Sequence, residues 1–253
     1  EGRGVGVHGT MHVGGGITVL SDADAEWREL KLKARFLTID RKPFKLIETL
    51  RFEKGSFLFL EEHLSRLQDS AAYFDFRFNR ATILEKLLGT ALRLNRLWSY
   101  RVRFLLGRNG EVTLSSERIE QAFGSDQQIG NIVLSKKHVD SSDVFLFHKT
   151  TNRDLYNREY SRAKKSGFVD AIFQNERGEL TEGAITNLFL RFNSKLYTPP
   201  LSCGLLKGVL RQHLISEGSV TEKILFPEDL ASAEEIYVGN SVRGLMRVTF
   251  SDL

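Results

Sequence analysis

The 253-residue sequence contains a single cysteine, Cys203, and no long apolar run. One thiol excludes an internal disulfide bond, and such sparing use of cysteine is typical of a reducing compartment. No stretch approaches the roughly 18–20 apolar residues that a membrane-spanning helix needs, and the N-terminal EGRGVGVHGTMHVGGG lacks the apolar stretch of a signal peptide. We therefore expect a soluble, cytoplasmic protein without a membrane partner.

A strong charge of one sign is also missing. Lys and Arg number 36 and Asp and Glu number 32, which gives a formal net charge of +4, and no basic tract of five or more residues occurs. Nucleic-acid-binding surfaces usually cluster their basic residues. The scattered charges indicate a solvated surface with some attraction for small anions. A non-catalytic basic binding protein is therefore the least favoured interpretation, and no nucleic-acid partner is expected.

The apolar content, 41%, is sufficient for a sizeable core, and the sequence pattern changes twice along the chain. Residues 1–36 combine a glycine cluster with a helix that has acids early and lysines late, as the helix dipole favours. Residues 37–125 read as a small α+β lobe, and residues 126–253 as a larger lobe. Strands with helices between them predict a two-lobed α+β fold whose loops converge between the lobes.

Hydrophobic periodicity and turn residues locate the elements of both lobes. In the small lobe we expect a hairpin of strands 44–52 and 56–60, helices 61–74 and 80–94, and two strands within 100–116. In the larger lobe we expect strands at 129–135, 171–174, 187–192 and 196–198, helices at 152–166 and from about 208, and strands around the Gly-Asn-Ser loop within 234–250.

Two ionisable residues occupy positions where a charge is costly. Lys149 follows the apolar run 144–147, so its stem should be buried and its amine desolvated, which lowers the pKa and favours attack on a carbonyl. The alternative is a lysine at a strand end whose amine reaches solvent. Glu182, in LTEGAITNLFL, immediately precedes a strand that should be buried. A carboxylate there needs a partner, unless it lies at the surface.

Three further features could bind an anion. Gly208 and Val209 would present free backbone N–H groups at a helix N-terminus, and the loop 239–241 would add a second tight turn. Arg66, in EEHLSRL, has forked donors that suit a phosphate, although a solvated arginine and ordinary turns would give the same patterns. A nucleophilic lysine, an acid, an arginine and two N–H-rich turns together are what pyridoxal phosphate requires.

From about Phe44 to Val248 the chain resembles the fold-type IV pyridoxal-phosphate enzymes, which include branched-chain and D-amino-acid aminotransferases and 4-amino-4-deoxychorismate lyases. The resemblance rests on EEHLSRL, FHKTTNR, LTEGAITNLFL, LYTPPLSCGLLKGVLR and YVGNSVRGLMRV, which occur in the family's order and spacing. It implies pyridoxal phosphate as cofactor, with Lys149 as the Schiff-base lysine, Glu182 as partner of the pyridine nitrogen, Arg66 as a phosphate ligand, and further phosphate contacts from the backbone of Val209 and Leu210 and from Ser241.

Within this group, FHKTTNR and residues 47–76 resemble the lyases. Branched-chain aminotransferases tend to carry a tyrosine directly after the asparagine, where this chain has Arg153. Residues 13–34 resemble the C-terminal end of chorismate-utilising synthases, in which a glycine loop and helix acids help to bind chorismate and magnesium; the matching positions are Gly14–Gly16, Glu26 and Glu29. We expect residues 1–36 to be the remnant of a fused or associated synthase, or alternatively an unusual N-terminal extension.

The resemblance thus implies a lyase that converts 4-amino-4-deoxychorismate to 4-aminobenzoate and pyruvate, a folate precursor step, with a branched-chain or D-amino-acid aminotransferase as the alternative. Thr49 matches a position that faces the substrate and would assist proton transfer to the leaving group, unless it is an ordinary strand hydroxyl. Arg103, Arg153 and Arg243 are candidates for the substrate carboxylates, and no metal ligand is predicted among the site residues. The resemblance also implies a homodimer, to which residues 71–78 would contribute.

Overall fold

The computed structural model describes residues 22–23, 27, 43–119 and 128–251. The chain divides into two compact units, Glu1–Pro43 and Phe44–Leu253, and the fold described here is that of the second unit. The predicted boundaries after residues 36 and 125 lie outside the described residues. The same is true of Gly14–Gly16, Glu26 and Glu29, so their predicted relation to a synthase stays a prediction.

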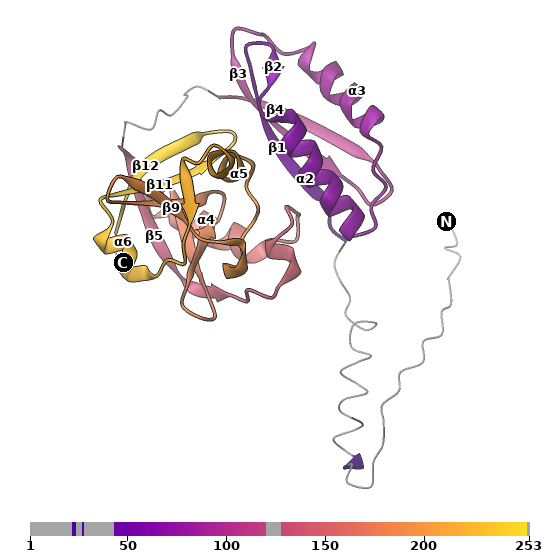
Figure 1. Cartoon of the computed structure of the whole chain (residues 1–253). Helices are drawn as coiled ribbons and strands as arrows, with labels where there is room; N and C mark the ends of the chain where they lie inside the picture. The colour runs from indigo at the N-terminus through magenta and orange to yellow at the C-terminus, as the bar shows by residue number, and fades with distance from the viewer. Residues whose placement is uncertain (1–21, 24–26, 28–42, 120–127, 252–253) are drawn as a thin grey trace. The chain divides into compact units, whose positions relative to one another are not determined.

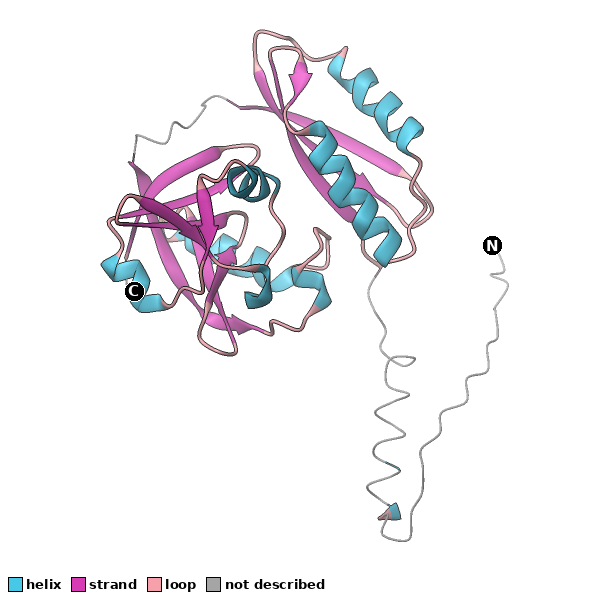
Figure 2. Cartoon of the chain, viewed as in Figure 1, coloured by secondary structure: helices cyan, strands magenta, loops and turns pink. Residues whose placement is uncertain are grey.

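A four-stranded antiparallel sheet and two helices form the first part of this unit (Figure 1). Within the described residues the strand order is β2-β1-β3-β4. The strands are β1 (Leu46–Glu53), β2 (Ser56–Phe57), β3 (Ser99–Leu106) and β4 (Val112–Ile119), and helices α2 (Leu60–Tyr73) and α3 (Arg80–Ala91) cover one face of the sheet (Figure 2).

The predicted strand at 56–60 is too long. Phe59 has a positive φ of 54° and is the N-cap residue of α2, so the backbone leaves the sheet after Phe57. Helix α2 then buries Leu64, Leu67 and Ala71, which recur at helical spacing. These side chains share an apolar core with α3, β1 and β3. Packing against that core fixes β1 beneath α2.

A second, larger sheet follows, and part of it closes into a ring. In the described part of the chain, β7 pairs with both β6 and β8, which completes the circuit β8-β11-β12-β5-β6-β7, and β9 and β10 extend the sheet from β8. The bounds are β5 (Gln128–Val139), β6 (Asp170–Asn175), β7 (Leu180–Gly183), β8 (Asn187–Phe192), β9 (Lys195–Thr198), β10 (Val220–Glu222), β11 (Glu235–Asn240) and β12 (Gly244–Phe250).

The ring closes at a single residue pair, Glu182 of β7 and Asn187 of β8. Sequence analysis placed Glu182 just before a buried strand, whereas it lies within a short strand of its own. Apolar residues of β5, β6, β8, β11 and β12 pack into one buried cluster, which includes Ile132, Ile172 and Val238. The closing strand therefore sits on a rigid support.

Helices α4 (Asp154–Lys165), α5 (Val209–Ser216) and α6 (Pro227–Ser232) complete the fold, with short 3-10 turns η1 (Val144–Leu146) and η2 (Leu201–Cys203). The apolar run before Lys149 thus forms a turn, and Lys149 does not end a strand. The α+β class expected from the sequence is confirmed. Across the described ranges, no helix has both the length and the apolar character required to cross a bilayer.

Candidate active site

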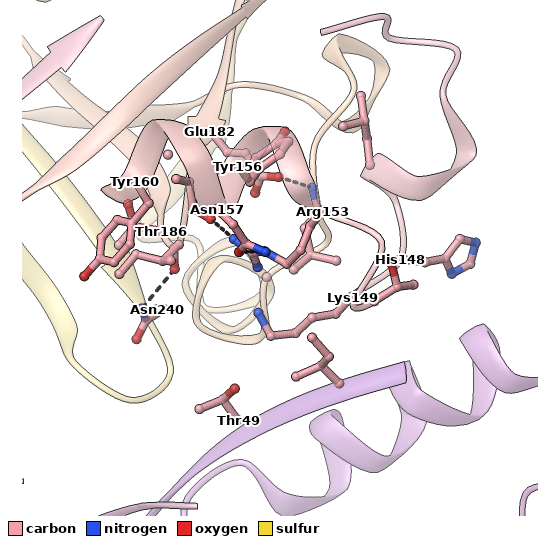
Figure 3. Close-up of a pocket in the computed structure, with 18 of the residues that line it drawn as sticks. Thr49, His148, Lys149, Arg153, Tyr156, Asn157, Tyr160, Glu182, Thr186 and Asn240 are labelled. Atoms are coloured by element: carbon pink, nitrogen blue, oxygen red, sulfur yellow. Dashed lines mark hydrogen bonds between the residues drawn. The ribbon is translucent and has the colours of Figure 1, made fainter. Parts of the chain in front are cut away.

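A cavity of about 660 Å³ is lined by residues from both sheets and from the loops that follow β5, β7 and β11. Its volume lies within the range of roughly 300–1,000 Å³ that is usual for small-molecule sites. Side chains far apart in the sequence meet in it, as Figure 3 shows for Thr49, Lys149 and Glu182. Of the predicted site residues, the structure brings together Thr49, Arg66, Arg103, Lys149, Arg153, Glu182, Val209, Ser241 and Arg243, while Leu210 follows Val209 in the first turn of α5.

Lys149 is held by backbone pairing with the start of β1. Ile47 N–H donates to the Lys149 carbonyl at 2.8 Å, and Thr151 N–H donates to the Lys45 carbonyl at 2.9 Å. Thr150 between them is buried and forms an isolated bridge with Leu46. Because this short ladder fixes the backbone, the Lys149 side chain points into the cavity (Figure 3).

The surroundings of the Lys149 amine favour its neutral form. The pKa of Lys149 is lowered to about 7, mainly by burial and then by the nearby guanidinium groups of Arg153 and Arg66. The Glu48 and Glu182 carboxylates raise the pKa, but by less. Near neutral pH a large fraction of the lysine therefore carries a free electron pair. Such an amine can attack a carbonyl group without first losing a proton.

Glu182 faces the same cavity from β7. Asn187 Nδ2 donates to Glu182 Oε2 at 3.2 Å, and Leu206 N–H donates to Oε1 at 3.2 Å. Burial nevertheless raises the pKa of the Glu182 carboxyl to about 8, because two weak hydrogen bonds and the charges of Arg153 and Lys149 only partly offset desolvation. A carboxyl group in this state is suited to share a proton with a basic nitrogen inside the cavity.

Gly208 is required by close approach to Asn187. A Cβ atom at position 208 would lie 1.8 Å from Asn187 Oδ1. Gly208 is the N-cap residue of α5, and no side chain caps that end of the helix. The predicted free N–H is wrong for Gly208, whose N–H donates to the Leu206 carbonyl at 2.8 Å. The N–H groups in the first turn of α5, beginning with that of Val209, remain available to an anion.

The remaining predicted residues lie around the cavity on different elements. Arg103 is paired with Thr49 across β3 and β1. Arg153 is the N-cap residue of α4; its Nε donates to Asn157 Oδ1 at 3.1 Å and its Nη2 donates to the Ala184 carbonyl. Ser241 and Arg243 belong to the β11–β12 turn, which is stabilised by a bond from Arg243 N–H to Asn240 Oδ1 at 3.0 Å. Cationic side chains thus enter from three separate elements.

Sequence reasoning missed Tyr156, which lines the cavity beside Glu182 (Figure 3). Its ring stacks on Phe173 at a centroid distance of 4.5 Å, and its buried hydroxyl has no hydrogen-bond partner among the described residues. Burial and, to a smaller extent, the neighbouring Glu182 carboxylate raise the pKa of Tyr156, so its hydroxyl keeps its proton and remains a hydrogen-bond donor. The available signal was its position three residues after Arg153 on one helix, which places both on the same face.

Comparison with known proteins defines the class. Residues 45–250 match the amino-transferase class IV family, and the chain belongs to that family. A Schizosaccharomyces pombe protein provisionally named aminodeoxychorismate lyase is 28% identical over 204 residues, covering 78% of this chain and 86% of the relative.

Solved structures agree on the fold. A Mesorhizobium loti structure, provisionally named an amino-acid aminotransferase, superposes with a TM-score of 0.76 and 40% identity, covering 82% of this chain and all of the other. A Haemophilus somnus structure, provisionally named 4-amino-4-deoxychorismate lyase, has a TM-score of 0.63 and 26% identity, covering 81% of this chain. The protein is an enzyme of a family that uses pyridoxal phosphate.

The residues of the cavity fit this cofactor. The Lys149 amine matches its aldehyde, the Glu182 carboxyl matches its ring nitrogen, and Arg66 with the uncapped end of α5 matches its phosphate. The buried Tyr156 hydroxyl lies beside the Glu182 carboxyl without a close hydrogen bond to it, so it can donate to a polar atom of the cofactor. A buried donor without a partner is costly unless a ligand accepts from it.

Proposed function

We propose that this enzyme is a pyridoxal-phosphate-dependent lyase that converts 4-amino-4-deoxychorismate to 4-aminobenzoate and pyruvate. The observation that carries the proposal is one cavity in which a desolvated lysine and a buried acid lie together with arginines from separate elements. The substrate has two carboxylates, and Arg103, Arg153 and Arg243 are the cations proposed to bind them. Similarity to the S. pombe and H. somnus proteins supports the same reaction.

The proposed roles follow from the site geometry. The cofactor, when bound, supplies an electron sink. Lys149 Nζ holds the cofactor and, once the substrate amino group has displaced it, accepts the proton from the substrate carbon that bears nitrogen. Glu182 holds a proton at the ring nitrogen. Thr49, on β1, donates a proton towards the enolpyruvyl oxygen as the carbon–oxygen bond breaks and the ring becomes aromatic.

An aminotransferase acting on a branched-chain or D-amino acid is the second candidate. It is supported by the 40% identity to the M. loti structure, which is named an amino-acid aminotransferase without a stated substrate. Arg153 directly follows Asn152, and this favours the lyase, because branched-chain aminotransferases tend to carry a tyrosine at that position.

The proposal also includes a homodimer in which residues 71–78 approach the partner subunit. Tyr73 in that segment is 58% exposed. A monomer in sedimentation at micromolar concentration would argue against this assembly.

Product analysis separates the two reactions. Purified enzyme supplied with pyridoxal phosphate and 4-amino-4-deoxychorismate should release 4-aminobenzoate and pyruvate in equal amounts, with no added 2-oxo acid as amino acceptor. Amino transfer from an amino acid to a 2-oxo acid, with no 4-aminobenzoate formed, would instead identify an aminotransferase. We also propose that residues 1–36 are related to a synthase. The lyase reaction should nevertheless proceed without synthase activity.

A further inference from the structure

A buried carboxylate lies behind the proposed phosphate-binding arginine. Glu48, on β1, is 2% exposed, and it accepts hydrogen bonds from Arg66 Nε at 2.9 Å and from Arg66 Nη2 at 2.6 Å. Both carboxylate oxygens are used, so the contact is bidentate. Paired bonds of this kind fix the plane of the guanidinium as well as its position.

His63 supports the same carboxylate from α2. Its Nδ1 lies 2.6 Å from Glu48 Oε2, and its side chain is 1% exposed. Nδ1–H is the donor in this pair, because an ionised carboxylate only accepts. His63 Nε2 is buried and has no hydrogen-bond partner within the described residues, so the contact with Glu48 is the polar interaction that orients this ring.

The donors that remain on Arg66 point away from Glu48. A guanidinium has five N–H groups, of which Glu48 accepts two and the Lys207 carbonyl accepts one, from Nη1 at 3.1 Å. Lys207 directly precedes Gly208, the N-cap residue of α5. Arg66 therefore reaches from α2 to the loop that precedes α5, and it lines the cavity.

Glu48 does not strengthen the site by adding charge. Its carboxylate opposes the charge of Arg66 and by itself would weaken attraction for a phosphate. The arrangement instead immobilises a long side chain before the ligand arrives, so that less conformational freedom is lost on binding. The charge of Glu48 should lower the affinity for phosphate, whereas the immobilisation of Arg66 should raise it. A measurement of the phosphate contribution to affinity shows which effect is larger.

We propose that Glu48 and His63 are positioning residues that preorganise Arg66 for the phosphate group of the cofactor. The inference rests on the proposed phosphate role of Arg66, but not on which reaction the enzyme catalyses. It assigns a function to two buried polar residues that are not among those lining the cavity. Loss of either should therefore change recognition of the phosphate and leave recognition of the ring unchanged.

The test compares two ligands on the cofactor-free enzyme. Affinities for pyridoxal phosphate and for pyridoxal, which lacks the phosphate, are measured by absorbance titration, and their ratio reports the phosphate contribution. Glu48→Gln should lower this ratio by roughly 10- to 100-fold, the effect expected from losing a charge-assisted bond, with pyridoxal affinity changed by less than about twofold. Glu61→Gln is the matched control, since Glu61 is exposed and pairs with Arg80 on the same lobe.

A second pair of variants isolates the donor on His63. Asparagine can place its amide N–H where Nδ1–H lies, so His63→Asn should retain the ratio, whereas His63→Leu should lower it. Combining Glu48→Gln with Arg66→Met should cost no more than Arg66→Met alone, because Glu48 acts through Arg66.

Three results would overturn the inference. An unchanged or increased ratio in Glu48→Gln would show that the carboxylate merely offsets the charge of Arg66. A purely additive double variant would show that Glu48 acts independently of Arg66. An unchanged ratio in Arg66→Met would remove the phosphate role of Arg66 itself, and the product assay would still test the lyase separately.

Discussion

The backbone N–H of Ile47 donates to the carbonyl of Lys149 at 2.8 Å, which ties the proposed catalytic lysine to the strand that carries Glu48 and Thr49. Three successive residues of β1 thus have separate tasks: Ile47 holds Lys149, Glu48 holds Arg66, and Thr49 lines the cavity. Since successive residues of a strand alternate between its faces, this requires that both faces of β1 be covered. The burial of all three neighbouring positions from 46 to 48 agrees with that requirement.

Cofactor attachment should depend on pH through Lys149. The folded-state pKa of about 7 lies below the ordinary value of 10.5, so the amine is protonated and unreactive below pH 7 and free above it. The attachment rate, followed by absorbance in the ~400–430 nm region after mixing with pyridoxal phosphate, should rise through pH 7 and then level off. A rate that keeps rising towards pH 10 would show that the amine is not desolvated.

Replacing a neighbouring charge should move that midpoint. Arg153→Gln removes a positive charge that disfavours the ammonium, so the Lys149 pKa should increase and the attachment profile should shift to higher pH. Arg162→Gln, at the exposed last turn of the same helix, is the matched control and should leave the midpoint in place. Equal shifts in both variants would indicate a general charge effect.

Glu182→Gln should separate binding from turnover. The amide can still occupy the site beside Asn187, so the cofactor should remain bound, but it cannot hold a proton at the ring nitrogen. Turnover should fall by roughly 100-fold or more, as expected for loss of a proton-holding group, while the bound cofactor is retained in gel filtration. Parental turnover in this variant would contradict the role of Glu182; Glu228→Gln, exposed on α6, serves as control.

Gly208→Ala should destabilise the fold at the site. The new Cβ would lie 1.8 Å from Asn187 Oδ1, so Asn187 or the start of α5 must move, at a cost of about 1–3 kcal/mol in the free energy of unfolding. Gly89→Ala, in α3 with no atom within 4 Å, should be neutral or stabilising by up to about 1 kcal/mol. Denaturant unfolding measures both, and equal stability of the two variants would contradict the close approach.

Cys203 should be inert in the folded enzyme. It is fully buried, and burial together with Glu179 raises its pKa to about 12, so the reactive thiolate is scarcely populated. An aromatic disulfide reagent should release no signal from the native protein and one equivalent per chain in concentrated guanidinium, because the sequence has one cysteine. Rapid stoichiometric reaction of the native protein would show that the segment around η2 opens.

The sequence predicts the site better where a residue breaks a pattern than where it fits one. Lys149 after an apolar run and Glu182 before a buried strand both invite a chemical explanation, and the structure places both in one cavity. Glu48 gives no such signal, because it reads as the polar position of an alternating strand. Its burial depends on α2, whose His63 and Arg66 bind it from 15 and 18 residues further along the chain.

Strand β7 and Tyr156 were missed for the same physical reason, because both depend on contacts between separate elements. Strand β7 has only four residues and no apolar alternation, and it is defined by its pairing with β6 and, at Glu182 and Asn187, with β8. Tyr156 lies in DLYNREYSRAKK, a helix rich in charged residues, where a tyrosine reads as part of a solvated face. The contact with Phe173 that buries it joins two separate elements, and local sequence carries no record of it.

The covalent site is the most direct test of the account. Borohydride reduction of the enzyme loaded with pyridoxal phosphate, followed by proteolysis and mass spectrometry, should place the reduced adduct on the peptide that contains Lys149. Lys149→Ala should show no adduct and no absorbance in the ~400–430 nm region while remaining folded, and Lys165→Ala, at the exposed end of α4, should behave as the parent. An adduct on a different lysine, or parental turnover by Lys149→Ala, would contradict the central claim.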